Sequence, residues 1–290
     1  MIKESTVGNL TSDLDPHSTQ HEAVKTGQSN VCLKPLLNGF QCHFLADQSR
    51  ANLMDRVDTK FMLSLSELPV FLSALKDEYT ILEQDRRRLF TYETTYYDTP
   101  DRLFYRSHHN GKLNRHKVRF RRYRDTHTAF MEVKLKNNKQ RTIKKRMQLD
   151  AEKPDFSNTS VFLKDSLGEH VLHLERVLLV KYQRITLMNK KEAERLTLDL
   201  SLSFKSARTG STLMNLPDIG LPQLCIAELK RNHKSKTSAF LRCIKERQIR
   251  PASFSKYCIG SALVDPGALK RNRFKATLKQ INSLTEIKTM

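Results

Sequence analysis

Basic side chains recur at alternate positions in a short β-type segment, residues 118–124. Arg119 and Arg121 alternate there with Val118 and Phe120. Because successive side chains of a strand point to opposite faces, the two guanidinium groups share one face and the apolar side chains share the other. The planar fork of arginine matches the oxygens of phosphate groups. This spacing predicts a surface that binds phosphate anions.

The same alternation recurs in four other segments that are typical of strands. Their polar positions are Arg56, Asp58 and Lys60; Glu132, Lys134 and Lys136; Arg195, Thr197 and Asp199; and Glu228 with Lys230. Two arrangements fit: an open sheet whose charged face meets water, or a closed barrel with helices outside and a charged lumen. Within such a lumen, Glu132 and Glu228 could bind a divalent metal or pair with the neighbouring cations.

Other chemistries have weaker support in the sequence. No GxxxxGKS/T or GxGxxG loop occurs, HExxH is absent, and spacing suggests no Ser, His and acid arrangement, which argues against P-loop, Rossmann, zincin and hydrolase sites. His108 and His109 are interpreted as a pair in a surface turn. A basic cluster could instead bind nucleic acid, and only the strand alternation argues against that alternative. The cluster consists of Lys112, Arg115, Lys117, Arg119, Arg121, Arg122 and Arg124.

The bulk composition also favours an anionic partner. The chain has 290 residues, 38% of them hydrophobic, and a formal charge of +20, which predicts one large domain that binds nucleic acid, acidic lipid or polyphosphate. Five scattered cysteines without a CxxC pair indicate a reducing, cytoplasmic location. Residues 1–30 have the composition of a disordered or mobile tail, so residues 31–290 are expected to form the domain. Neither a signal peptide nor a membrane span is expected.

The first part of the domain is expected to contain a helix, a strand and a second helix, in that order. Apolar residues at helical spacing predict a short helix within residues 33–53, and residues 56–61 predict a strand. A second helix should follow, capped by Ser64 or Ser66 and with Val70 on its inward face.

The rest of the chain is dominated by strand patterns. Residues 90–149 predict an antiparallel meander of short strands. Further strands are expected at 178–185, 196–204 and 224–230, and further helices at 161–167, after Ser238 and at 274–284. We therefore expect an α+β fold, an antiparallel β-barrel or tunnel of about eight strands with flanking helices.

Several motifs, taken in order, resemble the VTC domain, the catalytic module of polyphosphate polymerases within the wider triphosphate tunnel fold. The resemblance extends from about residue 34 to the end of the chain. It rests on Arg56-Val-Asp-Thr-Lys60-Phe61, Tyr96-Tyr-Asp-Thr-Pro-Asp101, the segment Asn114 to Tyr123, Phe130-Met-Glu-Val-Lys-Leu-Lys136, Thr142-Ile-Lys-Lys-Arg146, Tyr182-Gln-Arg184, Arg195-Leu-Thr-Leu-Asp199, Ala227-Glu-Leu-Lys230 and Phe254-Ser-Lys-Tyr-Cys258.

The resemblance implies a tunnel in which basic side chains hold a nucleoside triphosphate, expected to be ATP, and a growing polyphosphate chain. Mn²⁺ or Mg²⁺ would be the cofactor. Carried onto matching positions, it implies catalytic roles for Arg119, Arg121, Lys134, Arg184 and Lys256, substrate contacts from Lys60, Lys144, Tyr182, Arg195 and Ser255, and a metal ligand in Glu228.

The sequence departs from the patterns of the superfamily in two places. Hydrolase members begin with ExExK, whereas this chain has Arg56, Asp58 and Lys60 at the equivalent positions, so two-metal hydrolysis is disfavoured. Ser253 stands where a lysine is expected in the best-known polymerases.

The expected function is transfer of the γ-phosphoryl group of a nucleoside triphosphate to inorganic polyphosphate. Two alternatives stay open: a tri- or polyphosphate hydrolase in the same tunnel, and a non-catalytic polyanion-binding module. Under the expected function nucleic acid is not a partner, and coupling of synthesis to transport would require a separate membrane protein.

Overall fold

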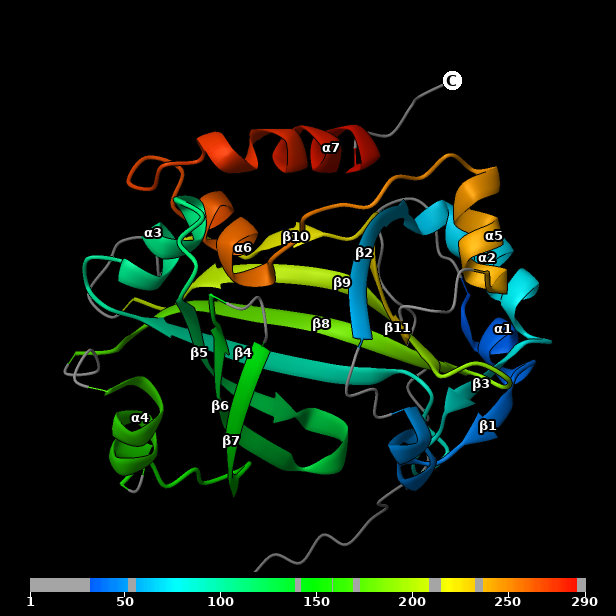
Figure 1. The fold of residues 1–290 in the computed structure, drawn as a ribbon, viewed down its shortest axis with the longest axis horizontal. Coiled ribbons are helices and arrows are strands. Elements are labelled where there is room, and N and C mark those ends of the chain that lie inside the picture. The colour runs from blue at the N-terminus through cyan, green and yellow to red at the C-terminus, as the bar shows by residue number, and fades with distance from the viewer. Residues whose placement is uncertain are drawn as a thin grey trace, which may run out of the picture.

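The computed structural model describes residues 32–51, 56–138, 142–157, 159–168, 173–208, 215–232 and 237–285 (Figure 1). The tail predicted for residues 1–30 lies outside these residues. The strands are β1 Gln41–His43, β2 Arg56–Ser64, β3 Tyr79–Leu82, β4 Phe90–Asp98, β5 Arg115–Tyr123, β6 Thr128–Lys136, β7 Thr142–Asp150, β8 Glu175–Asn189, β9 Glu194–Ser206, β10 Ile219–Leu221 and β11 Leu224–Asn232. The α-helices are α1 Lys34–Asn38, α2 Leu68–Leu75, α3 Leu103–His109, α4 Thr159–Leu167, α5 Ala239–Glu246, α6 Lys256–Val264 and α7 Lys275–Thr285; short 3-10 turns are η1 Leu45–Ala51, η2 Leu65–Glu67, η3 Arg124–Thr126 and η6 Asn272–Phe274.

Eight strands form one continuous antiparallel path in the order β2-β11-β9-β8-β4-β5-β6-β7. The predicted meander is confirmed, because β4 to β7 pair in chain order. In Figure 1, β2 runs across the direction of β8 and β9, as expected of a strongly twisted and curved sheet. The predicted α+β fold is therefore confirmed. Among the described residues no backbone ladder joins β2 to β7, so hydrogen bonding between strands does not continue around a complete ring.

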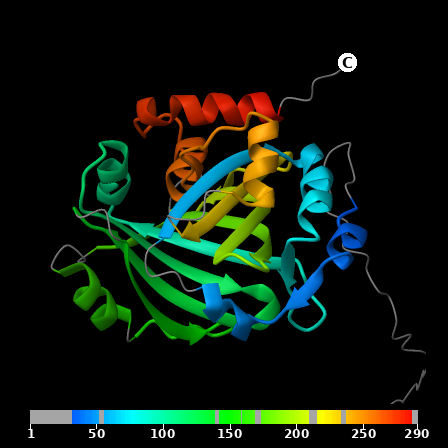
Figure 2. The ribbon, with the colours of Figure 1, turned by 45° about the vertical axis from the view of Figure 1, so that its right-hand side comes forward.

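Helices cover the apolar outer face of this sheet. Beside β2 and β11, Phe240 of α5 packs between Phe61 and Phe71, with ring centroids 5.6 and 6.0 Å away. In Figures 1 and 2, α2 and α5 lie together, while α3 and α6 gather at the other side beneath α7. On β2, β9 and β11 the apolar residues of one face, among them Phe61, Leu198 and Ala227, pack in one cluster with α2 and α5, so the alternating charged residues face the interior of the tunnel. The helix α6 instead packs against the inner face of the sheet.

The helix α6 approaches the sheet closely because Gly260 has no side chain. A Cβ atom at Gly260 would lie 2.9 Å from Leu178 of β8 and would also collide with the ring of Phe204 of β9. The close approach brings the beginning of α6, with Ser255 and Lys256, to the inner face of the sheet. Ser255 caps this helix by accepting a hydrogen bond from the backbone N–H of Cys258 at 3.2 Å.

Asp98, at the end of β4, ties α3 and α6 together. This fully buried carboxylate accepts hydrogen bonds from the backbone N–H groups of Phe104 and Tyr105 at 2.8 and 2.9 Å, and from the Tyr257 hydroxyl of α6. Tyr96 stacks on Tyr257 with ring centroids 5.2 Å apart. The motif that begins at Tyr96 therefore holds α6, and with it Lys256, in place.

The predicted helix within residues 33–53 is only partly present. The helix α1 ends at Asn38, and the chain then forms β1, because the free edge of β3 offers backbone partners for a parallel strand. In α2 the predicted inward position Val70 is 52% exposed. Ser238 does cap α5, since its hydroxyl accepts from the backbone N–H of Leu241 at 3.3 Å.

Two helices were not predicted at all. Residues His108 and His109 end α3 and do not form an isolated turn. The helix α6 is buried on almost every side, so it lacks the two-faced periodicity by which helices are recognised in a sequence. Among the described residues, no helix is both long enough and apolar enough to cross a membrane.

Candidate functional site

A cavity of about 780 Å³ lies on the inner face of the sheet, and each of the eight strands of the path contributes to its lining. Eleven lysine and arginine side chains line it, against four carboxylates. The cations are Lys60, Lys117, Arg119, Arg121, Lys134, Lys144, Arg146, Arg184, Arg195, Lys230 and Lys256. Such an excess of positive charge within one cavity attracts polyanions.

Glu132 on β6 holds together cations of β5 and β7. Its carboxylate is 1% exposed, accepts from Arg119 Nε at 2.6 Å and pairs with Lys144, while Arg121 Nη1 lies 3.9 Å away. Burial would raise the pKa of Glu132, but the three cations outweigh burial and hold the pKa well below its usual range. Of the two roles left open by the sequence, Glu132 therefore takes that of ion-pair partner.

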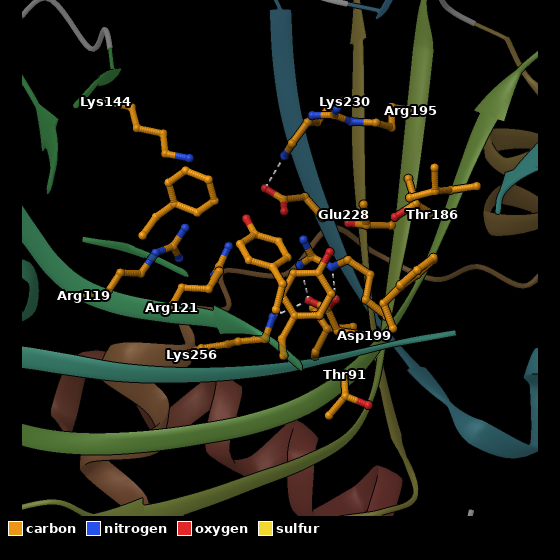
Figure 3. A pocket seen from close by; sticks show the side chains of 18 of the residues that line it. Thr91, Arg119, Arg121, Lys144, Thr186, Arg195, Asp199, Glu228, Lys230 and Lys256 are labelled. Atoms are coloured by element: carbon orange, nitrogen blue, oxygen red, sulfur yellow. Dashed lines mark hydrogen bonds and ion pairs between the residues drawn. The ribbon is translucent and has the colours of Figure 1, made fainter. Parts of the chain in front are cut away.

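Asp199 on β9 organises a second group of cations. Arg184 donates to its two carboxylate oxygens at 2.5 and 2.9 Å, and Lys256 pairs with Oδ2. Burial acts to raise the pKa of Asp199, but Arg184 and Lys256 dominate and lower it to about 2. Figure 3 shows Lys256 reaching toward Asp199, with Arg119, Arg121 and Lys144 on the left of the view. Both cation groups are thus held in place before any ligand binds.

Tyr182 lies beneath the second group of cations. The ring is 2% exposed and stacks on Tyr92 with centroids 5.1 Å apart. The ring centroid is 5.4 Å from the guanidinium of Arg184 and 4.4 Å from the ammonium of Lys256, distances typical of cation–π contacts. Tyr182 therefore supports the cations from below, and its predicted direct contact with a ligand stays a prediction.

Glu228 on β11 is paired with a lysine of its own strand. Lys230 Nζ lies 2.6 Å from Glu228 Oε1 (Figure 3). It also lies 3.4 Å from Asp58 Oδ2, so it bridges carboxylates of β11 and β2. Burial would raise the pKa of Glu228, but Lys230 and Lys60 hold it well below its usual range. The Glu228 carboxylate therefore stays ionised at neutral pH.

The donor set around Glu228 limits how a metal could be held. Within the described part of the chain, no group of three or more His, Cys, Asp or Glu side chains is arranged to hold a metal ion. Mg²⁺ is often bound by one or two carboxylates together with phosphate oxygens and water. The site thus fits a divalent metal that arrives with a phosphate ligand and gains one contact from Glu228.

Three lysines of the cavity form no ion pair with the residues that the structure describes. Lys60 Nζ donates to the carbonyl oxygen of Phe254 at 2.9 Å, and Lys117 Nζ donates to Ser255 Oγ at 3.0 Å. Lys134 makes neither a hydrogen bond nor an ion pair within this set; burial, reinforced by the nearby charge of Arg119, lowers its pKa to about 6. The Lys60 and Lys117 ammonium groups, and the Lys134 amine once it takes up a proton, are therefore the groups most readily engaged by an anionic ligand.

Ten of the eleven predicted site residues line this one cavity, and Tyr182 lies behind it. The predicted site residues did not include Lys117, Arg146, Asp199 and Lys230, although the alternation places Asp199 and Lys230 on the charged faces of their strands. Alternation could have found them, because each lies two or four residues from a predicted member on the same strand.

The family model for the VTC domain matches residues 55–265, which is more than half of the chain. The chain therefore belongs to the VTC domain family. No curated protein matches it.

Solved structures resemble the chain only distantly. HpAC1 from Hippeastrum, described as having a dominant triphosphatase activity, is 14% identical, with 75% of this chain and 98% of that chain covered and a TM-score of 0.45. A candidate adenylate cyclase from Vibrio parahaemolyticus is 14% identical over 71% of this chain and 97% of that chain, with a TM-score of 0.41. PH1819 from Pyrococcus horikoshii is 13% identical over 71% and 98%, with a TM-score of 0.40. None of these likenesses carries an argument about activity.

Proposed function

We propose that this protein is a polyphosphate polymerase, which transfers the γ-phosphoryl group of a nucleoside triphosphate, most simply ATP, to a chain of inorganic polyphosphate. The observation that carries the proposal is the convergence of eleven cations in one cavity, ten from seven strands and one from α6. Membership of the VTC domain family supports the same ligand class. A linear phosphate polymer offers a negative charge at each step along such a lining.

The cavity provides binding and charge neutralisation, which phosphoryl transfer chiefly needs. Its transition state is loose, with charge spread over the phosphoryl oxygens, so positioned cations can accelerate the reaction without a covalent step on the protein. Arg119 and Arg121 from β5, Lys134 from β6 and Arg184 from β8 would surround the transferred group, and Lys256 would extend the array from α6. The acceptor is the terminal phosphate of the chain, so no side-chain nucleophile is required.

Glu228 would hold the divalent metal, Mn²⁺ or Mg²⁺, together with phosphate oxygens of the substrate. When bound there, the metal would supply positive charge next to the β- and γ-phosphates. The depressed pKa of Glu228 keeps the carboxylate in the ionised form that this role requires. Lys60, Lys144, Arg195 and Ser255 line the remaining walls and would position the substrate.

The test is to incubate the purified protein with ATP and Mn²⁺ and to resolve the products by chain length on a gel. Long phosphate chains are the expected product. Release of free phosphate alone would instead identify a tri- or polyphosphate hydrolase, and binding without turnover of ATP would identify a polyanion-binding module. Arg121→Ala should abolish synthesis, whereas the control Arg122→Ala, on the outer face of β5 beside Glu93, should retain it.

A further inference from the structure

The inner face of the three-strand layer β5-β6-β7 carries an unusual arrangement of like charges. In the antiparallel register, Lys117 lies opposite Lys134, and Lys134 lies opposite Lys144. In the next inner-face row toward the start of β5, Arg115 lies opposite Lys136. Directly opposed side chains have Cβ atoms about 5 Å apart, and like charges in such positions destabilise a sheet.

Of the cations in the two rows, only Lys144 has an acidic partner, Glu132 of the neighbouring row. Among the described residues, no carboxylate forms an ion pair with Arg115, Lys117, Lys134 or Lys136, and the nearest row that contains one is that of Glu132. The Arg115 Nε–H group is buried and has no hydrogen-bond partner in the described part of the chain, while its Nη1 donates to the carbonyl oxygen of Lys112 at 3.0 Å. This end of the layer therefore has unneutralised charge and an unused donor.

The row formed by Arg115 and Lys136, called the outer row below, lies farther along the layer than the main cavity, and its position limits which ligand could bind there. Residues two apart in a strand are separated by roughly 7 Å, so Arg115 lies roughly 7 Å beyond Lys117 and roughly 20 Å from Arg121 along β5. Neither Arg115 nor Lys136 lines the main cavity, which ends near Lys117 on this strand. A triphosphate held at Arg121, roughly 20 Å from Arg115 along β5, would not extend to the outer row, whereas a longer linear phosphate chain would.

We propose that Arg115 and Lys136 form a subsite outside the main cavity that binds inorganic polyphosphate chains longer than a triphosphate and guides them along β5 and β6. This subsite rests on the proposed function, since it extends the same phosphate path. The charge of Arg115 also acts on His108 of the neighbouring helix α3. Burial lowers the pKa of His108 to about 3, and the charges of Lys117 and Arg115 lower it further.

The experiment compares the binding of two anions, tripolyphosphate and a long inorganic polyphosphate, to the wild type and to the double variant Arg115→Gln/Lys136→Gln. Affinity for the long chain should fall roughly tenfold, because two charge-assisted contacts are lost. The magnitude of the slope of log affinity against log salt concentration should decrease by roughly one to two. Affinity for tripolyphosphate should stay within roughly twofold. Thermal unfolding should occur at the same or a higher temperature, because the variant removes a pair of opposed cations.

The matched control is Lys145→Gln/Lys181→Gln, which removes the same charge from outward-facing positions of β7 and β8. It should leave binding of the long chain unchanged. The subsite is refuted if the two double variants lose long-chain affinity equally, or if Arg115→Gln/Lys136→Gln binds the long chain as tightly as the wild type. A wild type that binds neither anion would overturn the proposed function itself, which separates the two failures.

Discussion

Glu132→Gln should destabilise the free protein while it tightens the binding of phosphate chains. The substitution keeps the shape of a side chain that is 1% exposed but removes the charge that faces Arg119, Arg121 and Lys144. Removal of one partner of a buried ion pair costs about 3–5 kcal/mol, and the lower end applies because Lys144 is 36% exposed. At about 2 °C per kcal/mol for a chain of this size, the unfolding temperature should fall by about 6 °C or more.

The acid dependence of stability provides a second readout of the same ion pairs. Because the folded-state pKa of Glu132 is depressed, its contribution is fully present above the ordinary glutamate value of 4.5 and is lost as the pH falls toward the folded-state pKa. The unfolding temperatures of the wild type and Glu132→Gln should therefore differ at pH 7 and converge in acid. Circular dichroism in a phosphate-free buffer measures both.

Added phosphate ligand should reverse the defect. The three cations that lose Glu132 become available to the ligand, so tripolyphosphate should bind several-fold more tightly and should restore the unfolding temperature. The control is Glu93→Gln, which removes a carboxylate that pairs with Arg122 at the surface and should change stability by less than about 1 kcal/mol. Equal stability of Glu132→Gln and wild type at pH 7, or weaker tripolyphosphate binding by the variant, would refute this account of the site.

Three further predictions concern catalysis, packing and protonation. Arg121→Ala and Glu228→Ala should each still fold but lose roughly a hundredfold or more in the rate of ATP turnover. Near-normal turnover in steady-state assays would remove the residue from the site. Gly260→Ala should lower stability by about 1–3 kcal/mol through overpacking of α6 on the sheet, measured by denaturant titration, whereas Gly267→Ala, with open space around its Cβ, should not. The Lys134 pKa of about 6 should rise when a polyanion binds, so the binding of metal-free tripolyphosphate should take up a proton at pH 7.5 and should weaken as the pH increases. Calorimetry in buffers of different ionisation enthalpy measures this proton uptake. A binding heat that does not depend on the buffer would contradict the prediction.

The site was largely predictable from alternation within strands. Arg119 with Arg121, and Glu228 with Lys230, share inner faces because the side-chain period of a strand is two, whatever the tertiary fold. The resemblance to the VTC domain then pointed to positions on other strands. Lys256 could be assigned only through that resemblance, since α6 carries no periodic signal of its own.

The sequence by itself determined which side chains share a face of each strand, that these faces are basic, and that the chain belongs among α+β proteins with an antiparallel sheet. These features follow from local geometry and composition. Only the tertiary structure decided which carboxylate neutralises which cation, because Glu132 meets Lys144 of β7 and Asp199 meets Lys256 of α6 through contacts between segments that are distant in the chain. Long-range strand pairing also placed β2 next to β11. The register of this pairing determines which charged side chains converge in the cavity.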